Sequence, residues 1–305
     1  MLRFFVRRLL QAALTVTGVL TLGFLLIRAA GDPAALMLPE NATAADVARL
    51  RAEMGLDRPF LAQYAGFMAD ALRGDLGLSF RQQTSAVGLV IDRLPATLEL
   101  AFAAFLIGVT LAFGFDLMFR VTRSERLRRA VLGVALMRQA IPTFWFGLLL
   151  ILLFSVHLRW LPALGRGSLA HLVLPAVTLG TYELALYLRL LDASFREQET
   201  HDYVRTAYAK GLDRRRVVLG EMLPNVLLPM VTVAGLNLGV LLGGTVVTET
   251  VFSWPGVGRL IVQAVSQRDY PVVIAGVLLT SLIFVALNLI VDLLYGALDP
   301  RVRLT

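Results

Sequence analysis

Residues 202–225 read DYVRTAYAKGLDRRRVVLGEMLPN, a long polar interval between two apolar runs. Thr200 or Asp202 can cap a first short helix, because a side-chain oxygen at this position accepts from backbone N–H groups that otherwise have no partner. Gly211 follows Lys210 and can turn left-handed without a Cβ clash. The stretch therefore predicts a short helix that ends at a glycine turn.

A second short helix is predicted after the turn. Asp213 can cap it, and Pro224 is expected to end it. In the first helix, Val204, Ala207 and Tyr208 share one face at helical spacing. Small residues before a glycine turn let another protein approach the backbone closely. We therefore interpret the segment as a docking element that passes the motion of a partner into a membrane bundle.

The composition indicates a polytopic membrane protein. Hydrophobic residues make up 57% of the 305 positions, and the mean hydropathy is +0.72. Charged residues account for 17%, below the roughly 25% of soluble domains. The chain has no cysteine and only three scattered histidines, so the sequence predicts no disulfide, thiolate ligand or metal site.

Apolar runs predict an all-α protein with six membrane spans, since about 20 apolar residues cross a hydrocarbon core. The runs cover residues 9–27, 96–119, 130–156, 172–195, 226–252 and 271–297. The domain boundaries follow: 1–28 for the tail and first span, 29–95 for a helical extracytoplasmic insert, 96–297 for a five-helix core with a coupling loop at 196–225, and 298–305 for a tail.

Short helices are predicted within the insert. Thr43 and Asp46 have the spacing of a capping box, in which each residue hydrogen-bonds the other's backbone. Pro59 is placed to open another helix, and residues 87–94 form a third, separate from the span that follows.

The distribution of basic residues predicts the orientation. With six spans, sixteen Lys and Arg residues fall on the side of the amino terminus, and four fall in the two short loops opposite. Short cytoplasmic loops carry the excess of basic residues. Both termini and the coupling loop are therefore expected in the cytoplasm. The net charge of +7 is then explained by membrane orientation and by contact with lipid headgroups, and not by nucleic-acid binding.

Ionisable residues inside spans are costly and need partners. Two pairs have local helical spacing, Asp116 with Arg120 and Arg189 with Asp192. Arg138 and Glu183 have no local partner but fall at comparable depth on neighbouring spans. They either pair with each other or contact water or another subunit separately. Pro142 is expected to kink the third span just past Arg138.

The fifth span carries two patterns. Gly235, Gly239 and Gly243 recur at a strict interval of four, which is typical of closely packed membrane helices. The same span carries candidates for lining a translocation path, Asn237, Thr245, Thr248 and Glu249. One face can pack while another lines a path.

Motifs for catalysis are missing from the sequence. The single lysine, Lys210, lies in Ala-Lys-Gly and not in a phosphate-binding G-x-x-x-x-G-K-[ST] loop. The sequence also lacks H-E-x-x-H and G-x-S-x-G. We therefore expect no enzyme activity and no cofactor on this chain.

The chain resembles the membrane subunit of a bacterial ABC importer of the dipeptide, oligopeptide and nickel branch. The resemblance covers nearly the whole length and rests on an ordered series of motifs: GLDRP (55–59), GDLG (74–77), RLPATLELA (93–101), IPTFWFGLLLILLF (141–154), WLPALG (160–165), LPAVTLG (174–180), DYVRTAYAKGL (202–212), NVLLPMVTVAG (225–235), ETVFSWPGVGRL (249–260) and RDYP (268–271).

In this family, the coupling loop carries the pattern E-A-A-x3-G-x9-I-x-L-P and docks on an ATPase subunit. Gly211 matches its glycine and Ala207 its second alanine, whereas Arg205 stands at the acidic position and Glu221 at the isoleucine. The resemblance implies docking through the residues around the turn, namely Tyr203, Arg205, Ala207, Ala209, Lys210, Gly211 and Leu212.

The resemblance also implies partners and a location. The partners are a second homologous permease subunit in a heterodimer, one or two ATPase subunits that carry ATP and Mg, and an extracytoplasmic solute-binding protein. The location is the bacterial inner membrane, in contact with lipid. Peptides are the expected cargo, while nickel chelates, glutathione and glycosides remain open. The alternatives are an ion-gradient-driven secondary transporter, which would need inverted repeats that the sequence does not show, and a scaffold without a translocation role.

Overall fold

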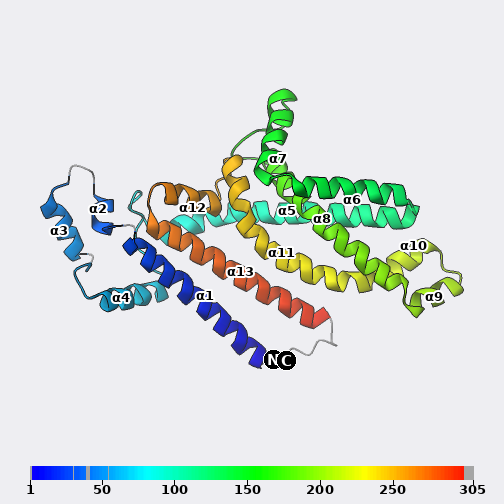
Figure 1. Cartoon of the computed structure of the whole chain (residues 1–305), viewed down its shortest axis with the longest axis horizontal. Coiled ribbons are helices and arrows are strands. Elements are labelled where there is room, and N and C mark those ends of the chain that lie inside the picture. The colour runs from blue at the N-terminus through cyan, green and yellow to red at the C-terminus, as the bar shows by residue number, and fades with distance from the viewer. Residues whose placement is uncertain (1, 30, 39–41, 54, 299–305) are drawn as a thin grey trace. The chain divides into compact units, whose positions relative to one another are not determined.

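The computed structural model describes residues 2–29, 31–38, 42–53 and 55–298 of the chain (Figure 1). Within these residues the structure is helical, and its one β-bridge joins Leu78 and Ser85. The predicted tail from residue 299 onward lies outside the described residues, and so do the side chains of Arg3 and Arg7. The chain divides into two compact units, which are described separately below.

The first unit comprises Met1–Ala96 and Pro255–Ile283. Its helices are α1 (Leu2–Ala29), α2 (Pro33–Met37), α3 (Ala44–Glu53), α4 (Phe60–Leu72), the start of α5 (Ala86–Thr122), α12 (Val257–Ser266) and the start of α13 (Tyr270–Leu298). Leu20, Val90 and Val257 are buried in its apolar core. The ring of Phe24 on α1 packs edge-on against Tyr64 on α4, with centroids 5.4 Å apart.

The second unit comprises Thr97–Trp254 and Phe284–Thr305. It contains the rest of α5 and α13 together with α6 (Glu125–Ala140), α7 (Thr143–Leu150), a π-helical segment (Ile151–His157), α8 (Leu169–Glu199), α9 (Asp202–Ala209), α10 (Arg214–Arg216), a second π-helical segment (Val217–Met222) and α11 (Leu223–Val251). Tyr187, Leu191 and Phe195 of α8 are fully buried in its core, beside Met222 and Met230.

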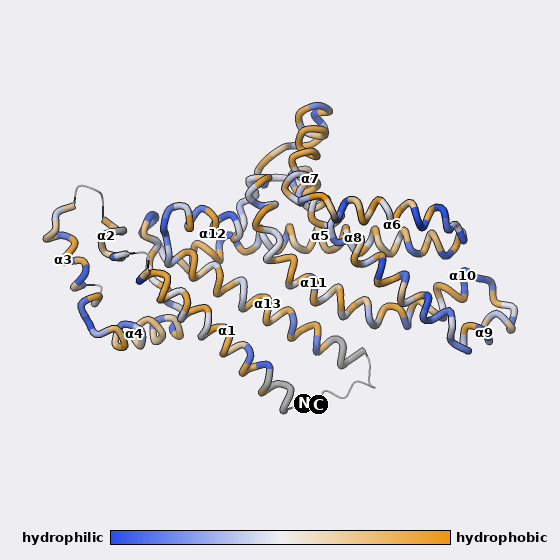
Figure 2. The backbone as a smooth tube through the Cα atoms, viewed as in Figure 1, coloured by the Kyte–Doolittle hydropathy of each residue, from blue (hydrophilic) through white to orange (hydrophobic). Residues whose placement is uncertain are grey.

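Five of the described helices are long and apolar enough to span a membrane, and a bent pair makes a sixth if its two parts form one span. Figure 2 shows these helices as mainly hydrophobic along their length. The bent pair joins α6 to α7 and the π-helical segment after it, with an angle of 105°. Pro142 lies at this break, so the predicted kink is a full break in the helix. The chain is an all-α polytopic membrane protein.

Two predicted helix boundaries are wrong. Residues 87–94 do not form a separate helix, because α5 runs without interruption from Ala86 through Pro95 to Thr122. Pro224 does not end the second helix of the coupling loop. It lies at the start of α11, directly after the π-helical segment that ends at Met222, and the chain continues as a helix into the span.

The predicted helix caps gave mixed results. The capping box is confirmed, since Thr43 N donates to Asp46 (3.1 Å) and Asp46 N donates to the Thr43 hydroxyl (3.3 Å). The caps proposed for α9 are wrong: His201 holds the N-cap position without a side-chain bond, and the Thr200 hydroxyl donates backwards to Glu197. Asp213 is at the N-cap of α10, but its side chain pairs with an arginine of that helix instead.

Candidate functional site

Helix α9 has one buried face and one exposed face. Val204 and Ala207 are buried in the core of the second unit, and Tyr203 and Leu212 pack against the same core. The exposed residues are Asp202, Arg205, Thr206, Tyr208, Ala209, Lys210 and Gly211. Tyr208, which the helical spacing placed on one face with Val204 and Ala207, is therefore not buried with them. The structure therefore divides the seven residues implied in docking. Tyr203, Ala207 and Leu212 hold the segment to its own subunit, and the other four face outwards.

The turn after α9 depends on Gly211. Its φ of +81° lies in the left-handed region that other residues rarely adopt. The backbone N–H groups of Gly211 and Leu212 close the helix end by donating to Tyr208 (3.0 Å) and Ala207 (3.3 Å). A Cβ atom at Gly211 would meet nothing within 4 Å. The glycine is therefore required by backbone conformation and not by space.

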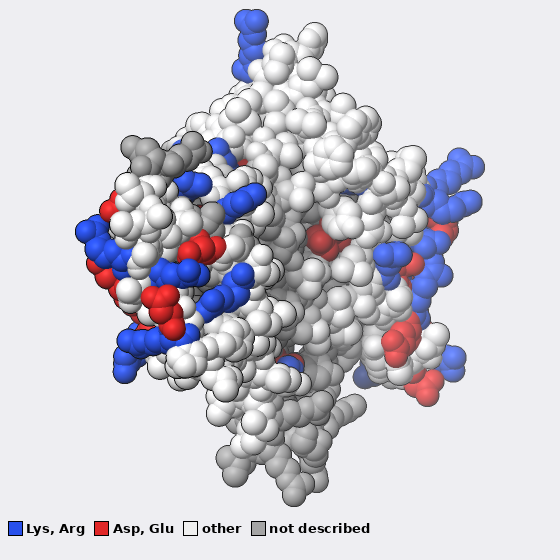
Figure 3. All heavy atoms as spheres, turned by 60° about the vertical axis from the view of Figure 1, so that its left-hand side comes forward, with Lys and Arg blue, Asp and Glu red and all other residues white. Residues whose placement is uncertain are grey.

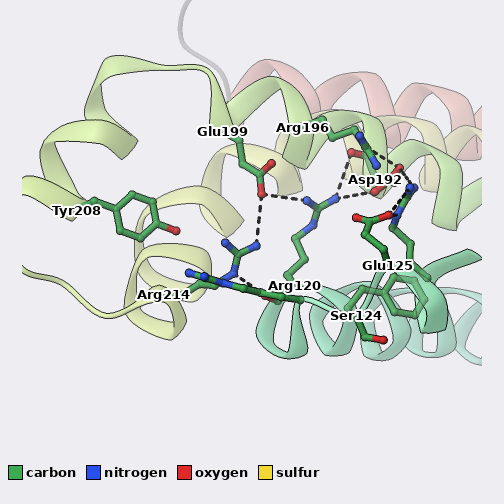
Figure 4. Close-up of a pocket in the computed structure, with 11 residues that line it drawn as sticks. Arg120, Ser124, Glu125, Asp192, Arg196, Glu199, Tyr208 and Arg214 are labelled. Atoms are coloured by element: carbon green, nitrogen blue, oxygen red, sulfur yellow. Dashed lines mark hydrogen bonds and ion pairs between the residues drawn. The ribbon is translucent and has the colours of Figure 1, made fainter.

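A cluster of arginines and carboxylates lies between α9–α10 and the ends of α5, α6 and α8 (Figure 4). Arg120 of α5 is almost fully buried and pairs with three carboxylates, Asp116 (3.1 Å), Asp192 (3.0 Å) and Glu199 (3.3 Å). Its guanidinium group also lies over the ring of Phe195, 4.6 Å from the centroid. The predicted local pair of Asp116 with Arg120 is thus confirmed, within a larger network.

Asp192 of α8 joins three helices in this arginine–carboxylate cluster. Besides Arg120, it accepts from Arg128 of α6 (3.1 Å) and Arg196 of α8 (3.0 Å). The predicted pair of Arg189 with Asp192 is wrong, because Arg189 donates to the carbonyl oxygen of Ala185 on its own helix. Asp192 instead faces α5 and α6, where the basic groups are closer. Sequence spacing cannot show such contacts between helices.

Arg138 and Glu183 do not pair with each other. The Arg138 guanidinium donates to the carbonyl oxygen of Thr178 (2.6 Å) and the hydroxyl group of Thr181 (3.1 Å) on α8. It also lies 3.9 Å from the centroid of the Phe146 ring. The predicted ion pair is therefore wrong, and Arg138 contacts residues of its own chain instead.

Glu183 contacts the fifth predicted span instead. The amide group of Asn237 on α11 donates to the Glu183 carboxylate and also contacts the Tyr187 hydroxyl (3.0 Å). Asn237 was a candidate for lining a translocation path. In this structure it connects α11 to α8 through a half-buried polar contact.

The other path candidates are buried. Thr245 and Glu249 have no exposed surface, and Thr248 is 1% exposed. The Glu249 carboxylate accepts a hydrogen bond of 2.7 Å from Thr97 on α5. These three residues therefore lie in the interior of the second unit in the conformation described.

Glycines bring helices close together at several places. A Cβ at Gly235 would lie 2.5 Å from Val291 of α13, and one at Gly239 would lie 2.9 Å from Phe284, whereas Gly243 has open space. Sequence reasoning missed a second contact: a Cβ at Gly180 of α8 would lie 2.6 Å from the carbonyl oxygen of Ala104 on α5. Gly180 is the last residue of the LPAVTLG motif, and this motif was the feature of the sequence that could have indicated the close contact.

Metal binding has no support in the described residues. No three His, Asp or Glu side chains among them lie close enough together to hold an ion. The arginine–carboxylate cluster offers several guanidinium groups, which can bind an anion.

Comparison with known proteins identifies the family. A model described as "Binding-protein-dependent transport system inner membrane component" matches residues 104–304. The chain belongs to this family. A second model, for the N-terminal part of such membrane components, matches residues 1–101 of the permease subunit.

Curated relatives match the permease subunit over its whole length. The Dipeptide transport system permease protein DppB of Escherichia coli strain K12 is 38% identical, with 99% of each chain covered. The Di/tripeptide transport system permease protein DppB of Pseudomonas aeruginosa is also 38% identical, with the same coverage. The Glutathione transport system permease protein GsiC of Escherichia coli O6:H1 is 40% identical, again with 99% of each chain covered.

Solved structures share the fold of the permease subunit. The MetNI methionine ABC transporter in inward-facing conformations aligns with a TM-score of 0.56 and 18% identity, over 69% of this chain and 96% of that chain. An amino acid ABC transporter aligns with a TM-score of 0.52 and 15% identity, over 70% of this chain and 94% of that chain.

These matches establish the class of the protein. It is a multi-pass inner-membrane permease subunit of an ABC importer and is not itself the ATPase. The matches support this function over the ion-gradient-driven transporter considered from the sequence.

Proposed function

We propose that this permease subunit forms part of the path for peptides or similar small solutes such as glutathione. The proposal rests on the relatives, which are named for dipeptide, di/tripeptide and glutathione transport. Its expected partners are a second homologous permease subunit, an extracytoplasmic solute-binding protein and one or two ATPase subunits that hold ATP and Mg.

The docking site for the ATPase subunit is proposed to be the exposed face of α9 with the Gly211 turn. The observation that carries this proposal is the division of α9, where Val204 and Ala207 are buried while Ala209 and Lys210 are exposed. Small exposed groups beside a glycine turn leave the backbone open to a groove on a partner. Closure of the ATPase subunits around ATP would then move α9 and α10, and α11 would follow because it continues directly from them.

The orientation belongs to the same proposal. The basic residues on the side of the amino terminus favour cytoplasmic termini and a cytoplasmic coupling loop. Helices α2 to α4 then form the insert on the extracytoplasmic side. In this arrangement, α9 and α3 lie on opposite sides of the membrane.

Photocrosslinking tests both docking and orientation. The chain has no cysteine, so Ala209→Cys can be labelled with a maleimide photocrosslinker in the assembled importer. We expect capture of an ATPase subunit. Ala52→Cys, exposed on α3, and Ala207→Cys, buried on the same helix as Ala209, are the matched controls. Capture from Ala52, or none from Ala209 in an importer that hydrolyses ATP, would refute the proposal.

Uptake by proteoliposomes tests the cargo. The complete importer, with its binding protein and ATP inside the vesicles, is supplied in turn with a labelled dipeptide and with labelled glutathione. We expect ATP-dependent uptake of at least one of them. Uptake of neither would contradict the substrate class while leaving the family assignment intact.

A further inference from the structure

The arginine–carboxylate cluster lines a cavity of about 530 Å³ within the second unit, open to solvent on the side of the exposed Arg123 and Arg196. Five arginines line it, from α5, α6, α8, α10 and the turn between α5 and α6: Arg120, Arg123, Arg128, Arg196 and Arg214. Only three carboxylates line the same space. Figure 4 shows the labelled side chains converging from separate helices. The lining therefore carries an excess of positive charge.

The carboxylates of the lining are already shared among several arginines. Asp192 accepts from Arg120, Arg128 and Arg196, and Glu199 pairs with both Arg120 (3.3 Å) and Arg214 (3.7 Å). A guanidinium group has five N–H donors, which is more than one shared carboxylate oxygen can satisfy. Donors must therefore remain for another acceptor.

Two arginines of the lining have the most unused donors. Arg123 makes no hydrogen bond or ion pair with any residue that the structure describes, and Arg196 uses only its Nε atom in contacts with described residues. The cavity has room for an anion larger than a carboxylate. One guanidinium group can donate two parallel hydrogen bonds to two oxygens of a phosphate. Arg123 and Arg196 both have enough unused N–H groups to bind in this way.

The cavity lies at the end of membrane-spanning helices, where the phosphate group of a lipid would be found. Arg120 and Arg196 lie near the ends of α5 and α8, which are long and apolar enough to span a membrane. Phe119 and Tyr208 add aromatic surface to the lining. Aromatic and basic residues together are typical of the depth at which lipid phosphates lie.

We propose that this cavity binds a phosphate-bearing anion, held by the guanidinium groups of Arg123 and Arg196. The anion is either the phosphodiester of an anionic phospholipid or free inorganic phosphate. Since Tyr208 of α9 and Arg214 of α10 line the same cavity, the bound anion contacts both the transmembrane helices and the proposed docking segment. The inference concerns a ligand, so it holds whether or not α9 meets an ATPase subunit.

The test uses the assembled importer in nanodiscs and two double variants. Arg123→Gln/Arg196→Gln removes two charges from the cavity, and Asp192 still keeps Arg120 and Arg128 as partners. Arg126→Gln/Arg215→Gln removes two charges from exposed positions outside it. Both double variants lose two positive charges. A difference in anion binding between them would therefore show a defined site and not general electrostatic attraction.

Two arms distinguish the sources of phosphate. In the first, native mass spectrometry counts phosphatidylglycerol molecules retained from nanodiscs that contain this lipid in phosphatidylcholine. In the second, equilibrium dialysis measures inorganic phosphate bound in pure phosphatidylcholine nanodiscs. We expect binding in at least one arm, about tenfold weaker in the cavity variant and unchanged in the control variant.

Each outcome is decisive. Loss of phosphatidylglycerol in the cavity variant alone assigns the site to a lipid headgroup, and loss of inorganic phosphate alone assigns it to the free anion. If neither anion binds the wild-type complex, or if both double variants lose binding equally, the proposal is wrong.

Discussion

The Nε atom of Arg214 donates a hydrogen bond of 2.6 Å to the backbone carbonyl oxygen of Arg120. The bond joins α10, just after the Gly211 turn, to the last turn of α5. Glu199 of α8 reinforces the connection by pairing with both arginines. The proposed docking segment is thus fastened to two membrane helices near its own glycine turn.

Loss of this bond should weaken the coupling between the ATPase and the membrane path. Arg214→Gln removes the contacts with Arg120 and Glu199, whereas Arg215→Gln removes an exposed charge beside it. We expect substrate-stimulated ATP hydrolysis by the assembled importer to fall about fivefold or more in Arg214→Gln. Arg215→Gln should stay near the wild-type rate. Equal rates in the two variants would exclude a role for the bond.

The Gly211 turn should not tolerate a β-branched residue. Gly211→Val places a Cβ in open space but forces a side chain to adopt a φ of +81°, which costs about 1–3 kcal/mol. Gly114→Val on α5 is the matched control, since its Cβ also meets nothing and its φ is not in the left-handed region. We expect stimulated ATP hydrolysis to be lost in the first variant and kept in the second. Normal coupling in Gly211→Val would refute the role of the turn.

The contact between α5 and α8 at Gly180 should be sensitive to volume. A valine there would push against the backbone carbonyl oxygen of Ala104 and the side chain of Ile107, 2.6 and 2.9 Å from the Cβ. Overpacking of this kind costs about 1–3 kcal/mol. We expect a lower thermal midpoint for Gly180→Val in detergent than for Gly133→Val, where the Cβ has open space. The reverse order would contradict the described packing.

The cap of α3 should depend on pH. Hydrogen bonds from the hydroxyl group and backbone of Thr43 lower the pKa of the Asp46 carboxyl from 3.8. Because the folded pKa is the lower one, the stabilisation is present in full above 3.8 and is lost as the pH falls through the folded value. Asp46→Asn keeps the bond from the backbone N–H at position 46 to the Thr43 hydroxyl and removes only the carboxylate. It should therefore speed hydrogen exchange in α3 at pH 6, and the difference from wild type should vanish in strong acid. A difference that persists there would show that the carboxylate is not responsible.

The loop before α5 should depend on a buried carboxylate. Asp269 is 3% exposed. It accepts from the hydroxyl group of Ser79 and from the backbone N–H of Phe80 (3.0 Å). Asp269→Ala leaves both donors unpaired, at a cost of about 1–3 kcal/mol for each. We expect faster hydrogen exchange at residues 79–84 than in Asp92→Ala, which changes an exposed carboxylate of α5. Equal exchange in the two variants would contradict this reading.

Sequence reasoning succeeded for some local interactions. The left-handed turn at Gly211, the capping box at Thr43 and the pair of Asp116 with Arg120 each involve residues close in the chain, which helical geometry brings together. The equally local pair of Arg189 with Asp192 is wrong, because α5 and α6 offer Asp192 other partners. The apolar runs located the spans, although helix ends shifted by several residues.

Contacts between helices could not be predicted from spacing. Nothing in the sequence indicates that Asn237 contacts Glu183 or that Arg138 donates to Thr178, because each contact depends on the rotation of two helices about their axes. The burial of Ala207 is a similar case. Its place in a family pattern suggested a docking role, and the fold turns its side chain inward.

The chain from Arg214 to Val251 is helical throughout, without a loop between the docking segment and the membrane. Its irregular parts are the wide π-helical stretch at Val217–Met222, where each N–H reaches one residue further back than in an α-helix, and Pro229, which lacks an N–H inside α11. A displacement of Asp213 is therefore expected to reach α11 directly. It would appear as tilt of α11, as torsion about its axis, as bending at Pro229, or as a change in the number of wide turns.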